Sequence, residues 1–533
     1  MKYIFVSGGV ISGIGKGIAT SSIALLLKAA GYKVAPLKID PYLNVDAGTM
    51  NPIEHGETFV LDDGSETDQD LGNYERYLNE DLNKNNFTTS GQVYLSVIQR
   101  ERSLEYDGAC VEAVPHIPEE IIGRVNEAGK GMDVVIIEIG GTVGELQNVF
   151  IFEANRILKL NKDNDVVHIH VTYLPIPPSL GEMKSKPAQM SVKELNAMGI
   201  QPDILLARSG VAIDEARKKK LALFCSVEPE DIISSPDVKS IYQVPVNYED
   251  EGLTDRILTK LNLKRKNTDL KEWRAFVGKV NGAVTSVKIG IVGKYFTSGD
   301  FTLTDSYISV IEAIKHACFS QGFKPDIDWI DASQIEKNPG SLRQYQGIIV
   351  PGGFGSRDVE GKIAAIRYAR ENKIPYLGLC YGMQMACVEY ARDVFGMKGA
   401  HTTEIDPKTK FPIIHVMPDQ VKKLLKKDYG GTMRLGSWDA DLVKGSLVEK
   451  LYGKSETKER HRHRYEFNND YREQFDKSDL QIVATSPDGK LVEIVELKNH
   501  PFFVGTQFHP ELKSRPLNPH PLFMGFINAA SKI

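Results

Sequence analysis

A glycine-rich stretch and the apolar run before it decide the fold. The stretch reads Ser7-Gly8-Gly9-Val10-Ile11-Ser12-Gly13-Ile14-Gly15-Lys16-Gly17, and it follows the strand-like run Tyr3–Ser7. A helix-like segment, Gly17–Ala30, comes next. Glycines let a backbone wrap closely around phosphate oxygens, and a helix N-terminus supplies free N–H groups and a positive dipole. This strand–loop–helix pattern predicts a nucleotide-binding loop, with a plain strand-to-helix turn as the alternative.

The loop departs from the strict phosphate-loop motif at two positions. Val10 stands where the first glycine would be, with Gly9 one position early. Gly17 replaces the Ser or Thr that would hold Mg²⁺. Lys16 keeps its place and is expected to reach the outer phosphates.

Carboxylates should therefore hold the metal, because hard oxygen ligands suit Mg²⁺ bridging nucleotide phosphates. Two candidates are Asp70, in Asp68-Gln69-Asp70, and Glu138, near the end of the apolar strand Val134–Ile139. Ligands of α/β sheets bind at the carboxyl ends of strands. The alternatives are a helix cap for Asp70 and an ordinary strand-end charge for Glu138.

A second basic cluster precedes a helix-like segment at Pro187–Met198. It reads Lys184-Ser185-Lys186-Pro187-Ala188-Gln189, and Lys220 closes a further run of lysines. Several lysines at a helix start suit a second polyphosphate. Surface lysines are the alternative.

Short apolar runs alternate with helix-like segments through most of the chain, which indicates α/β domains with parallel sheets covered by helices on both faces. The alternation weakens over the polar stretch Lys264–Ser286, whose main apolar residues are Trp273 and Phe276. A second α/β series begins at Val287–Gly293. We expect a domain at 1–265, a linker at 266–286 that contains at most a short helix, and a second domain at 287–533.

A cysteine in the second series has the spacing of a nucleophile elbow. Gly378 and Gly382 bracket Cys380, between a strand-like run and a helix-like segment. Such a turn exposes the sulfur, and the helix N-terminus lowers the pKa of the thiol. Downstream, His509 and Glu511 are two residues apart, so they share a face of an extended segment and Glu511 can orient the imidazole.

Glycines upstream complete this expected site. Val350-Pro351-Gly352-Gly353-Phe354-Gly355 offers backbone N–H groups for an oxyanion hole. A nucleophile, a base with its orienting carboxylate and an oxyanion hole fit one mechanism, which favours a catalytic thiol over a buried structural cysteine.

Composition excludes several classes of protein. The chain has 533 residues, with 65 Lys and Arg against 70 Asp and Glu, so it does not coat nucleic acid. The sequence contains no apolar run long enough to span a membrane and no signal-peptide pattern. The five cysteines are scattered and odd in number. We expect a reducing, cytoplasmic location.

Taken together and in this order, these motifs resemble the CTP synthase family over essentially the whole chain. Further matching stretches are Lys38–Tyr42, Glu54–Glu57, Lys184–Gln189, Gly430–Gly436 and Arg462–Glu466. The resemblance implies a P-loop-type, parallel-sheet amidoligase domain followed by a class I glutamine amidotransferase α/β domain. In this family ATP phosphorylates the 4-oxygen of UTP, and ammonia from glutamine displaces the phosphate to give CTP.

The resemblance also implies roles in the first domain. Lys16 and Lys38 would stabilise the transferring phosphoryl group, and Asp70 and Glu138 would hold Mg²⁺. ATP would be bound by Ser12, Gly13, Ile14, Gly15, Lys16, Gly17, Asp70, Pro236, Asp237 and Val238. UTP, or CTP as a feedback inhibitor, would be bound by Ser12, Glu145, Leu146, Gln147, Lys184, Ser185, Lys186, Pro187, Ala188, Gln189 and Lys220.

In the second domain the resemblance implies a triad of Cys380, His509 and Glu511. Glutamine would be positioned by Gly353, Tyr381, Gly382, Met383, Gln384, Glu404 and Arg464. The charged run Glu456–Arg464, which by itself is typical of a solvated loop, would then end in a substrate-binding residue. His55 matches a family segment near the ammonia passage, with a structural histidine as the alternative. The family also uses GTP as an allosteric activator, forms homotetramers and can stack into filaments.

One departure from the family affects the pyrimidine site. CTP synthases usually read Gly-Asp-Ile-Glu where this chain reads Gly144-Glu145-Leu146-Gln147. Two other functions compete with CTP synthesis: a glutamine-dependent amidoligase of the cobyrinic acid type, and a filament-forming protein with reduced catalysis. The Lys184–Gln189 cluster argues against a corrinoid substrate, and the occupied catalytic positions argue against lost catalysis.

Overall fold

The computed structural model describes residues 1–161, 165–267, 269–293, 297–298, 301–302, 304–353, 358–417, 420 and 431–533. The chain divides into two units. Unit 1 comprises Met1–Asp46 and Asn73–Val277, and unit 2 comprises Ala47–Gly72 and Gly278–Ile533. Residues 47–72, here called the arm, therefore belong with the second half of the chain although they lie early in the sequence.

Unit 1 is built on a seven-stranded parallel sheet in the order β5-β2-β6-β1-β7-β8-β9. The strands are β1 (Lys2–Gly8), β2 (Val34–Asp40), β5 (Phe87–Thr89), β6 (Val134–Ile139), β7 (Val166–Tyr173), β8 (Ile204–Ser209) and β9 (Ile232–Pro236). They are continuous buried runs because helices cover both faces. The winding direction reverses around β1, and ligands of such sheets bind outside the carboxyl ends of the strands at that point.

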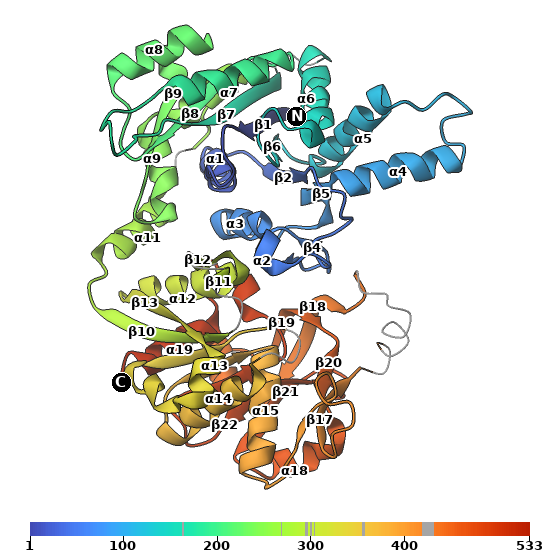
Figure 1. Ribbon diagram of the computed structural model, residues 1–533, viewed down its shortest axis with the longest axis vertical. Helices are drawn as coiled ribbons and strands as arrows, with labels where there is room; N and C mark the ends of the chain where they lie inside the picture. Colours follow the sequence, from blue (N-terminus) through green and yellow to red (C-terminus); the bar gives the residue numbers. More distant parts are fainter. Residues whose placement is uncertain are drawn as a thin grey trace. The chain divides into compact units, whose positions relative to one another are not determined.

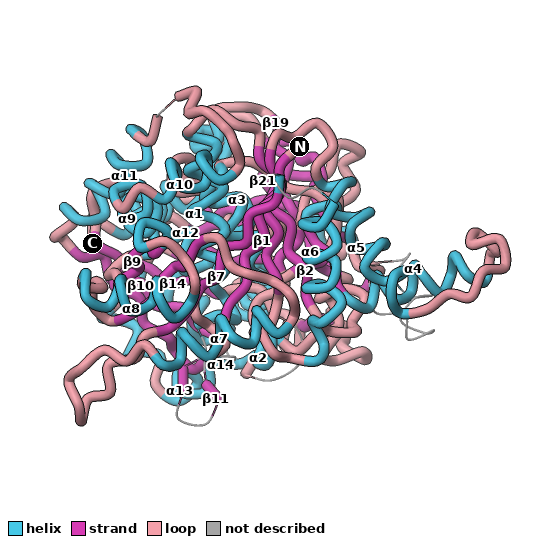
Figure 2. The backbone as a smooth tube through the Cα atoms, turned by 90° about the horizontal axis from the view of Figure 1, so that it is seen from above, coloured by secondary structure: helices cyan, strands magenta, loops and turns pink. Residues whose placement is uncertain are grey.

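Helix α1 packs against β1, β2 and β6, while α5 and α6 pack with Phe5 on the opposite face. The helices of this unit, or leading into and out of it, are α1 (Lys16–Ala29), α3 (Gln69–Leu78), α4 (Ser90–Arg102), α5 (Ala113–Ala128), α6 (Val149–Asn161), α7 (Lys186–Ala197), α8 (Glu215–Cys225), α9 (Val244–Asp250), α10 (Leu253–Lys260) and α11 (Lys271–Gly282). The α4–α5 pair extends beyond the β5 edge of the sheet (Figure 1). Figure 2 shows the same pair at one side of the unit.

The stretch predicted as a linker contains the helix α11. Its Trp273 and Phe276 side chains are buried, and the Trp273 indole donates a hydrogen bond of 2.9 Å to the carbonyl of Tyr242. This stretch therefore packs onto unit 1 through aromatic contacts and is more than a polar spacer.

Unit 2 is built on a nine-stranded mixed sheet in the order β13-β10-β14-β15-β23-β22-β21-β18-β19. The strands are β10 (Ser286–Gly293), β13 (Lys324–Asp331), β14 (Gly347–Val350), β15 (Tyr376–Leu379), β18 (Arg434–Leu442), β19 (Glu456–His463), β21 (Leu480–Thr485), β22 (Val492–Leu497) and β23 (Phe503–Thr506). From β13 to β23 the pairings are parallel, and from β23 to β19 they are antiparallel. The carboxyl ends of β14, β15 and β23 therefore meet at one edge.

Helices α12 and α19 share a core on one face of this sheet, and α14 and α15 share another. The helices are α2 (Pro52–His55), α12 (Ile308–Ser320), α13 (Ala332–Lys337), α14 (Val359–Asn372), α15 (Tyr381–Asp393), α17 (Leu447–Tyr452), α18 (Arg472–Asp476) and α19 (Pro521–Ala530). Shorter sheets pair β3 (Phe59–Val60) with β4 (Glu66–Thr67), β11 (Thr297–Ser298) with β12 (Phe301–Thr302), and β17 (Pro412–Val416) with β16 (His401–Thr402) and β20 (Tyr465–Phe467).

These two units confirm the predicted fold class. The expectation of a solvated loop over Glu456–Arg464 is wrong: these residues form β19 and its immediate continuation, and Arg460 and His461 are fully buried. The positive charges of this strand are compatible with burial because carboxylates of the arm form ion pairs with them. In the described ranges, the helices are too short or too polar to cross a lipid bilayer.

Candidate active sites

The phosphate loop joins the end of β1 to α1. Gly15 occupies the N-cap of α1 with a φ of 92°, and Gly13 has a φ of 70°. A Cβ at either position would meet no atom within 4 Å, so these glycines are needed for their backbone conformation rather than for space. Lys16 begins the helix, and its Nζ donates to the carbonyl of Gly141 at 2.6 Å.

A cavity of about 240 Å³ lies beside this loop in unit 1. It brings Gly15 together with Asp237 and Val238, two of the residues expected to contact adenine. Pro236 precedes them as the last residue of β9. The other lining residues are Ile18, Arg208, Ile241, Val244 and Tyr248. Arg208 reaches Asp237 at 2.8 Å, and no local sequence signal had marked it.

Lys38 and Glu138 face each other across adjacent strands. They are register partners on β2 and β6, and Lys38 Nζ lies 2.8 Å from Glu138 Oε1. The Tyr74 hydroxyl donates to the other oxygen, Oε2, at 2.5 Å. All three side chains are buried. Asp70 lies in the first turn of α3, within the arm, and so belongs to unit 2, whereas Glu138 belongs to unit 1.

The segment that departs from the family pattern is tied together by Glu145. Its Oε1 accepts from the Thr142 N–H at 2.7 Å and from the Thr142 hydroxyl at 2.6 Å, and its Oε2 accepts from Gln147 Nε2 at 2.6 Å. Burial raises the pKa of the Glu145 carboxyl, but the hydrogen bonds from Thr142 and Gln147 outweigh it, and the net pKa is lowered. Leu146, between the two, is 90% exposed.

The second basic cluster sits at the start of α7. Ser185 occupies the N-cap, and Gln189 Nε2 donates to the Ser185 hydroxyl at 3.1 Å. Lys184 Nζ lies 2.6 Å from Glu182, and hydrogen bonding to Lys184 lowers the pKa of that carboxyl, with smaller contributions from the charges of Arg217 and Lys220. Lys186, Pro187 and Ala188 form the first turn of α7.

A buried polar network that the sequence did not reveal links the phosphate loop to α7. The Ser7 hydroxyl contacts His168 Nε2 at 2.7 Å and His170 Nδ1 at 2.8 Å, and His170 Nε2 contacts the Ser191 hydroxyl at 3.0 Å. A Cβ on Gly9 would lie 2.6 Å from Ser191 Cβ, so the loop rests directly on this helix. Burial lowers the pKa of both histidines, that of His170 to about 3, so both are neutral at pH 7.

In unit 2, Cys380 stands between β15 and α15 with a φ of 49°. Such a conformation is strained for a residue with a side chain and is typical of nucleophile elbows. Both bracketing glycines are required by close packing: a Cβ on Gly378 would lie 2.8 Å from the Gly382 carbonyl carbon, and one on Gly382 would lie 2.1 Å from the Val350 carbonyl oxygen.

His509 follows β23 and is paired with Glu511, their Nδ1 and Oε1 atoms being 2.7 Å apart. Burial lowers the pKa of His509, but the negative charges of Glu511 and Cys380 raise it well above its usual value. The Nε2 atom is buried and has no hydrogen-bond partner in the described part of the chain. A ring held by a carboxylate on one nitrogen and open on the other can exchange a proton with the thiol.

A cavity of about 300 Å³ opens at this site. It brings together Gly352 and Gly353 of the expected oxyanion-hole segment with Cys380, Arg464, His509 and Glu511, which were also predicted. The other lining residues are Gly48, Met50, Pro52, Glu57, Thr58, Ser306, Tyr307, Met433, Arg462 and Leu512. Of the expected oxyanion-hole segment, Phe354 and Gly355 lie outside the described residues.

The remaining residues predicted to position glutamine do not line this cavity. Tyr381, Gly382, Met383 and Gln384 form the buried first turn of α15. Glu404 is half-buried. The pKa of the Tyr381 hydroxyl is raised by the burial of Tyr381 and, second, by the negative charge of Glu404.

The arm contributes part of the cavity wall, which the sequence did not indicate. Arg462 Nε lies 2.8 Å from Glu66 Oε1, and Arg462 Nη2 donates to the Gly48 carbonyl at 3.1 Å. Asp62 pairs with Arg460 and with Lys513. The basic run of β19 and the acidic residues of the arm were visible in the sequence as separate charges, but their pairing was not.

Comparison with known proteins gives a family match for each half of the chain. Residues 2–263 match the family described as CTP synthase N-terminus, and residues 302–529 match glutamine amidotransferase class-I. The chain is 49% identical over 99% of its length to a CTP synthase of Methanocaldococcus jannaschii, covering 98% of that protein. It is 50% identical over its full length to a CTP synthase of Pyrococcus abyssi, again covering 98%.

Among solved structures, the chain is similar to the glutaminase domain of Trypanosoma brucei CTPS with bound acivicin, with 37% sequence identity and a TM-score of 0.43. The match covers 46% of this chain and 94% of that domain. The full-length relatives, together with the two matched domains, place the chain: it belongs to the CTP synthase family.

Proposed function

We propose that this protein makes CTP from UTP, using ATP to activate the uracil and glutamine as the source of ammonia. The observation that carries the proposal is the elbow cysteine Cys380 with the His509–Glu511 pair, in a chain whose other unit holds a nucleotide loop. A glutaminase site alone would fit many amidotransferases. The phosphate loop and the Lys184–Gln189 cluster call for two nucleotides.

In the glutaminase half, His509 takes the thiol proton and the Cys380 sulfur attacks the side-chain amide of glutamine. Ammonia leaves with a proton from His509, and water then hydrolyses the thioester to glutamate. The backbone of Gly352 and Gly353, which line the cavity, would stabilise the oxyanion, and Arg464 would bind the substrate carboxylate. Tyr381, Gly382, Met383, Gln384 and Glu404 are proposed to shape the glutamine site around them.

In the synthase half, the uracil 4-oxygen leaves readily only after ATP has phosphorylated it, so catalysis is mainly positioning and charge stabilisation. Lys16 and Lys38 would stabilise the transferring phosphoryl group. Ser12–Gly17 and Pro236–Val238 would bind ATP. Glu145–Gln147, Lys184–Gln189 and Lys220, with Ser12, would bind UTP or CTP.

Magnesium suits the two predicted ligands by their donor chemistry. Asp70 and Glu138 are carboxylates, which suit Mg²⁺, and Glu138 is a buried carboxylate held in position by Lys38 and Tyr74. When bound, the ion would neutralise charge on the nucleotide phosphates. We further propose activation by GTP, a homotetramer able to form filaments, and a cytoplasmic location.

The test is CTP formation by the purified chain with Mg²⁺, ATP and UTP, first with glutamine and then with ammonium as nitrogen source. We expect a rise in absorbance at the CTP wavelength with both sources. A chain of the corrinoid type would show no UTP-dependent rise, and one with lost catalysis would show neither that rise nor glutamine hydrolysis. Either result would overturn the proposal.

A further inference from the structure

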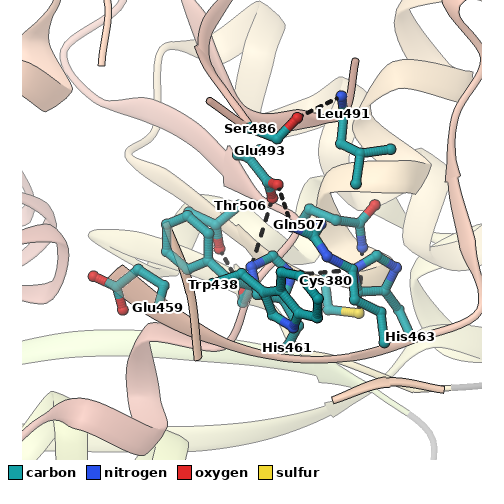
Figure 3. Close-up of polar contacts among 12 residues, drawn as sticks. Cys380, Trp438, Glu459, His461, His463, Ser486, Leu491, Glu493, Thr506 and Gln507 are labelled. Atoms are coloured by element: carbon teal, nitrogen blue, oxygen red, sulfur yellow. Dashed lines mark hydrogen bonds and ion pairs between the residues drawn. The ribbon is translucent and has the colours of Figure 1, made fainter. Parts of the chain in front are cut away.

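The side chain of Gln507 lies directly behind the nucleophile. It follows β23, is 1% exposed, and its Nε2 donates to the Cys380 sulfur at 3.6 Å. Its backbone N–H donates to the Glu493 carbonyl at 2.8 Å, and the Cys380 N–H donates to the Thr506 carbonyl at 2.7 Å. The parallel pairing of β15 with β23 therefore fixes Cys380, and the antiparallel pairing of β22 with β23 fixes Gln507. Figure 3 shows Gln507 beside Cys380, with His461, His463 and Glu493 around them.

The orientation of the Gln507 amide is set by its neighbour Gln384. Gln384 Nε2 donates to the backbone carbonyl of Tyr465 at 2.9 Å and to Gln507 Oε1 at 3.2 Å. A backbone carbonyl can only accept, so the nitrogen of Gln384 must point this way and must meet the oxygen of Gln507. The NH₂ group of Gln507 is thereby turned toward the sulfur.

The histidines nearby are arranged as neutral groups. His463 Nδ1 is 2.9 Å from the Tyr465 carbonyl, so it carries the proton, and its Nε2 then accepts from His461 Nδ1 at 3.0 Å. Behind them, Glu493 is neutralised by Arg434 at 2.7 Å. The charged groups that line the cavity with Cys380 are Glu57, Arg462, Arg464, His509 and Glu511.

We propose that Gln507 is a catalytic residue of glutamine hydrolysis that donates an N–H to the Cys380 sulfur and stabilises it as a thiolate. This inference rests on the function proposed above. The thiolate exists twice in the cycle: when His509 has taken the thiol proton, and when water has broken the thioester C–S bond and the electron pair returns to sulfur. A donor fixed on the sulfur favours both states, and hydrogen bonds to charged groups are the stronger kind.

A purely structural role would predict something different. If the amide served only to bridge Gln384 and β23, its loss would loosen the unit without changing the acidity of the thiol. The proposal instead requires the apparent pKa of Cys380 to rise when the donor is removed. The readout must therefore report the ionisation of this sulfur in the full-length protein, apart from turnover.

The experiment compares wild type with Gln507→Met, which keeps the side-chain length and removes the donor. The control Gln321→Met removes an amide elsewhere in unit 2, one that bonds to the Ala317 and Met524 carbonyls. Alkylation of Cys380 by iodoacetamide is followed by mass spectrometry across pH, with exposed Cys110 in the same molecule as the internal reference. Glutamine hydrolysis and ammonia-dependent CTP synthesis are measured on the same samples.

We expect Gln507→Met to move the Cys380 alkylation profile to higher pH and to reduce the kcat of glutamine hydrolysis about tenfold. Ammonia-dependent synthesis and the Cys110 profile should stay as in wild type, and Gln321→Met should change none of these. An unmoved Cys380 profile, or equal loss with both nitrogen sources, would overturn the proposal.

If Gln507→Met does not fold, Gln507→Glu serves instead. It keeps the shape, and its carboxylate repels the thiolate, so the upward move should be larger; no move or a downward one refutes the idea. Failure of the proposed function would be seen as a wild-type protein that releases no ammonia from glutamine. The alkylation profiles of that protein and of Gln507→Met would still show whether Gln507 governs the ionisation of Cys380.

Discussion

Asp62 and Arg460 are 398 positions apart in sequence and form an ion pair, with Oδ1 and Nε 2.5 Å apart. Arg460 is fully buried, and Asp62 also accepts from Lys513 Nζ at 3.1 Å. Burial raises the pKa of Asp62, but the charges of Arg460 and Lys513 lower it to about 2. This pair fastens the arm to β19, two residues along the strand from Arg462, which lines the Cys380 cavity.

We predict that Asp62→Asn destabilises unit 2 by about 1–3 kcal/mol, because it removes a carboxylate that pairs with the buried Arg460 charge. Glutamine-dependent synthesis should fall more than ammonia-dependent synthesis, since the arm lines the glutaminase cavity. Thermal unfolding and the two assays provide the measurement. Asp63→Asn, at the exposed neighbouring carboxylate, is the control. Equal effects of the two variants would contradict the prediction.

Cys380→Ala should abolish glutamine-dependent synthesis and leave ammonia-dependent synthesis largely intact. The thiol acts only in the glutaminase half, and without a nucleophile the oxyanion and binding groups supply a small remainder of the rate. Cys387→Ala, at the buried cysteine two turns along α15, controls for the loss of a thiol. Similar loss with both nitrogen sources would show that the two activities cannot be separated.

Lys16→Ala, and likewise Asp70→Asn, should remove synthesis with either nitrogen source. Both residues are proposed to act in phosphoryl transfer, which precedes the attack of ammonia. Initial rates with ammonium are the decisive measurement, and Lys28→Ala in the last turn of the same α1 helix is the control for Lys16. If a variant made CTP from ammonium at nearly the wild-type rate, the substituted residue would have no part in the mechanism.

Gln147→Glu should tighten feedback inhibition by CTP several-fold. Gln147 now donates to Glu145 Oε2, which occupies an acceptor that the ribose hydroxyls of CTP could use. A glutamate would free that oxygen and add a charged acceptor, a gain of about 1 kcal/mol. Inhibition constants at fixed UTP measure the effect, with Gln99→Glu on exposed α4 as the charge control. Unchanged or weaker inhibition would refute this prediction.

Unit 1 should lose stability as the pH falls below about 6.5. The folded-state pKa values of His168 and His170 are lowered by burial, that of His170 to about 3, whereas in the unfolded chain both are about 6.5. The unfolded state therefore binds more protons between these values. The contribution of His170 to stability is complete above pH 6.5 and declines by about 1.4 kcal/mol per pH unit as the pH falls toward 3, and His168 adds a loss in the same direction.

The measurement is urea unfolding at pH 7.5 and 5.5, followed by Trp273 fluorescence in a Trp329→Phe, Trp438→Phe background. Trp273 is buried in unit 1, so it reports that unit alone. His170→Asn should reduce the pH dependence by about half relative to this background. The same pH dependence with and without His170 would show that other groups are responsible.

Much of each site was predictable because its chemistry is local in sequence. A strand, a glycine turn and a helix N-terminus occupy consecutive residues at Ser7–Gly17, and backbone constraints there do not depend on distant parts of the chain. The same holds for Gly378–Gly382 around Cys380 and for the two-residue spacing of His509 and Glu511. In unit 2, the neighbouring β14, β15 and β23 then bring those local pieces to one edge.

The sequence by itself determined the fold class and predicted the two kinds of site and the nucleophile, because hydrophobic periodicity and glycine placement act over a few residues. Only the tertiary structure decided which charges are paired and buried. The pairing of Asp62 with Arg460, the register of Lys38 with Glu138 and the amide of Gln507 on the Cys380 sulfur each join segments far apart in the chain. Such contacts form only after the strands are packed, and nothing in the local pattern of either segment identifies its partner.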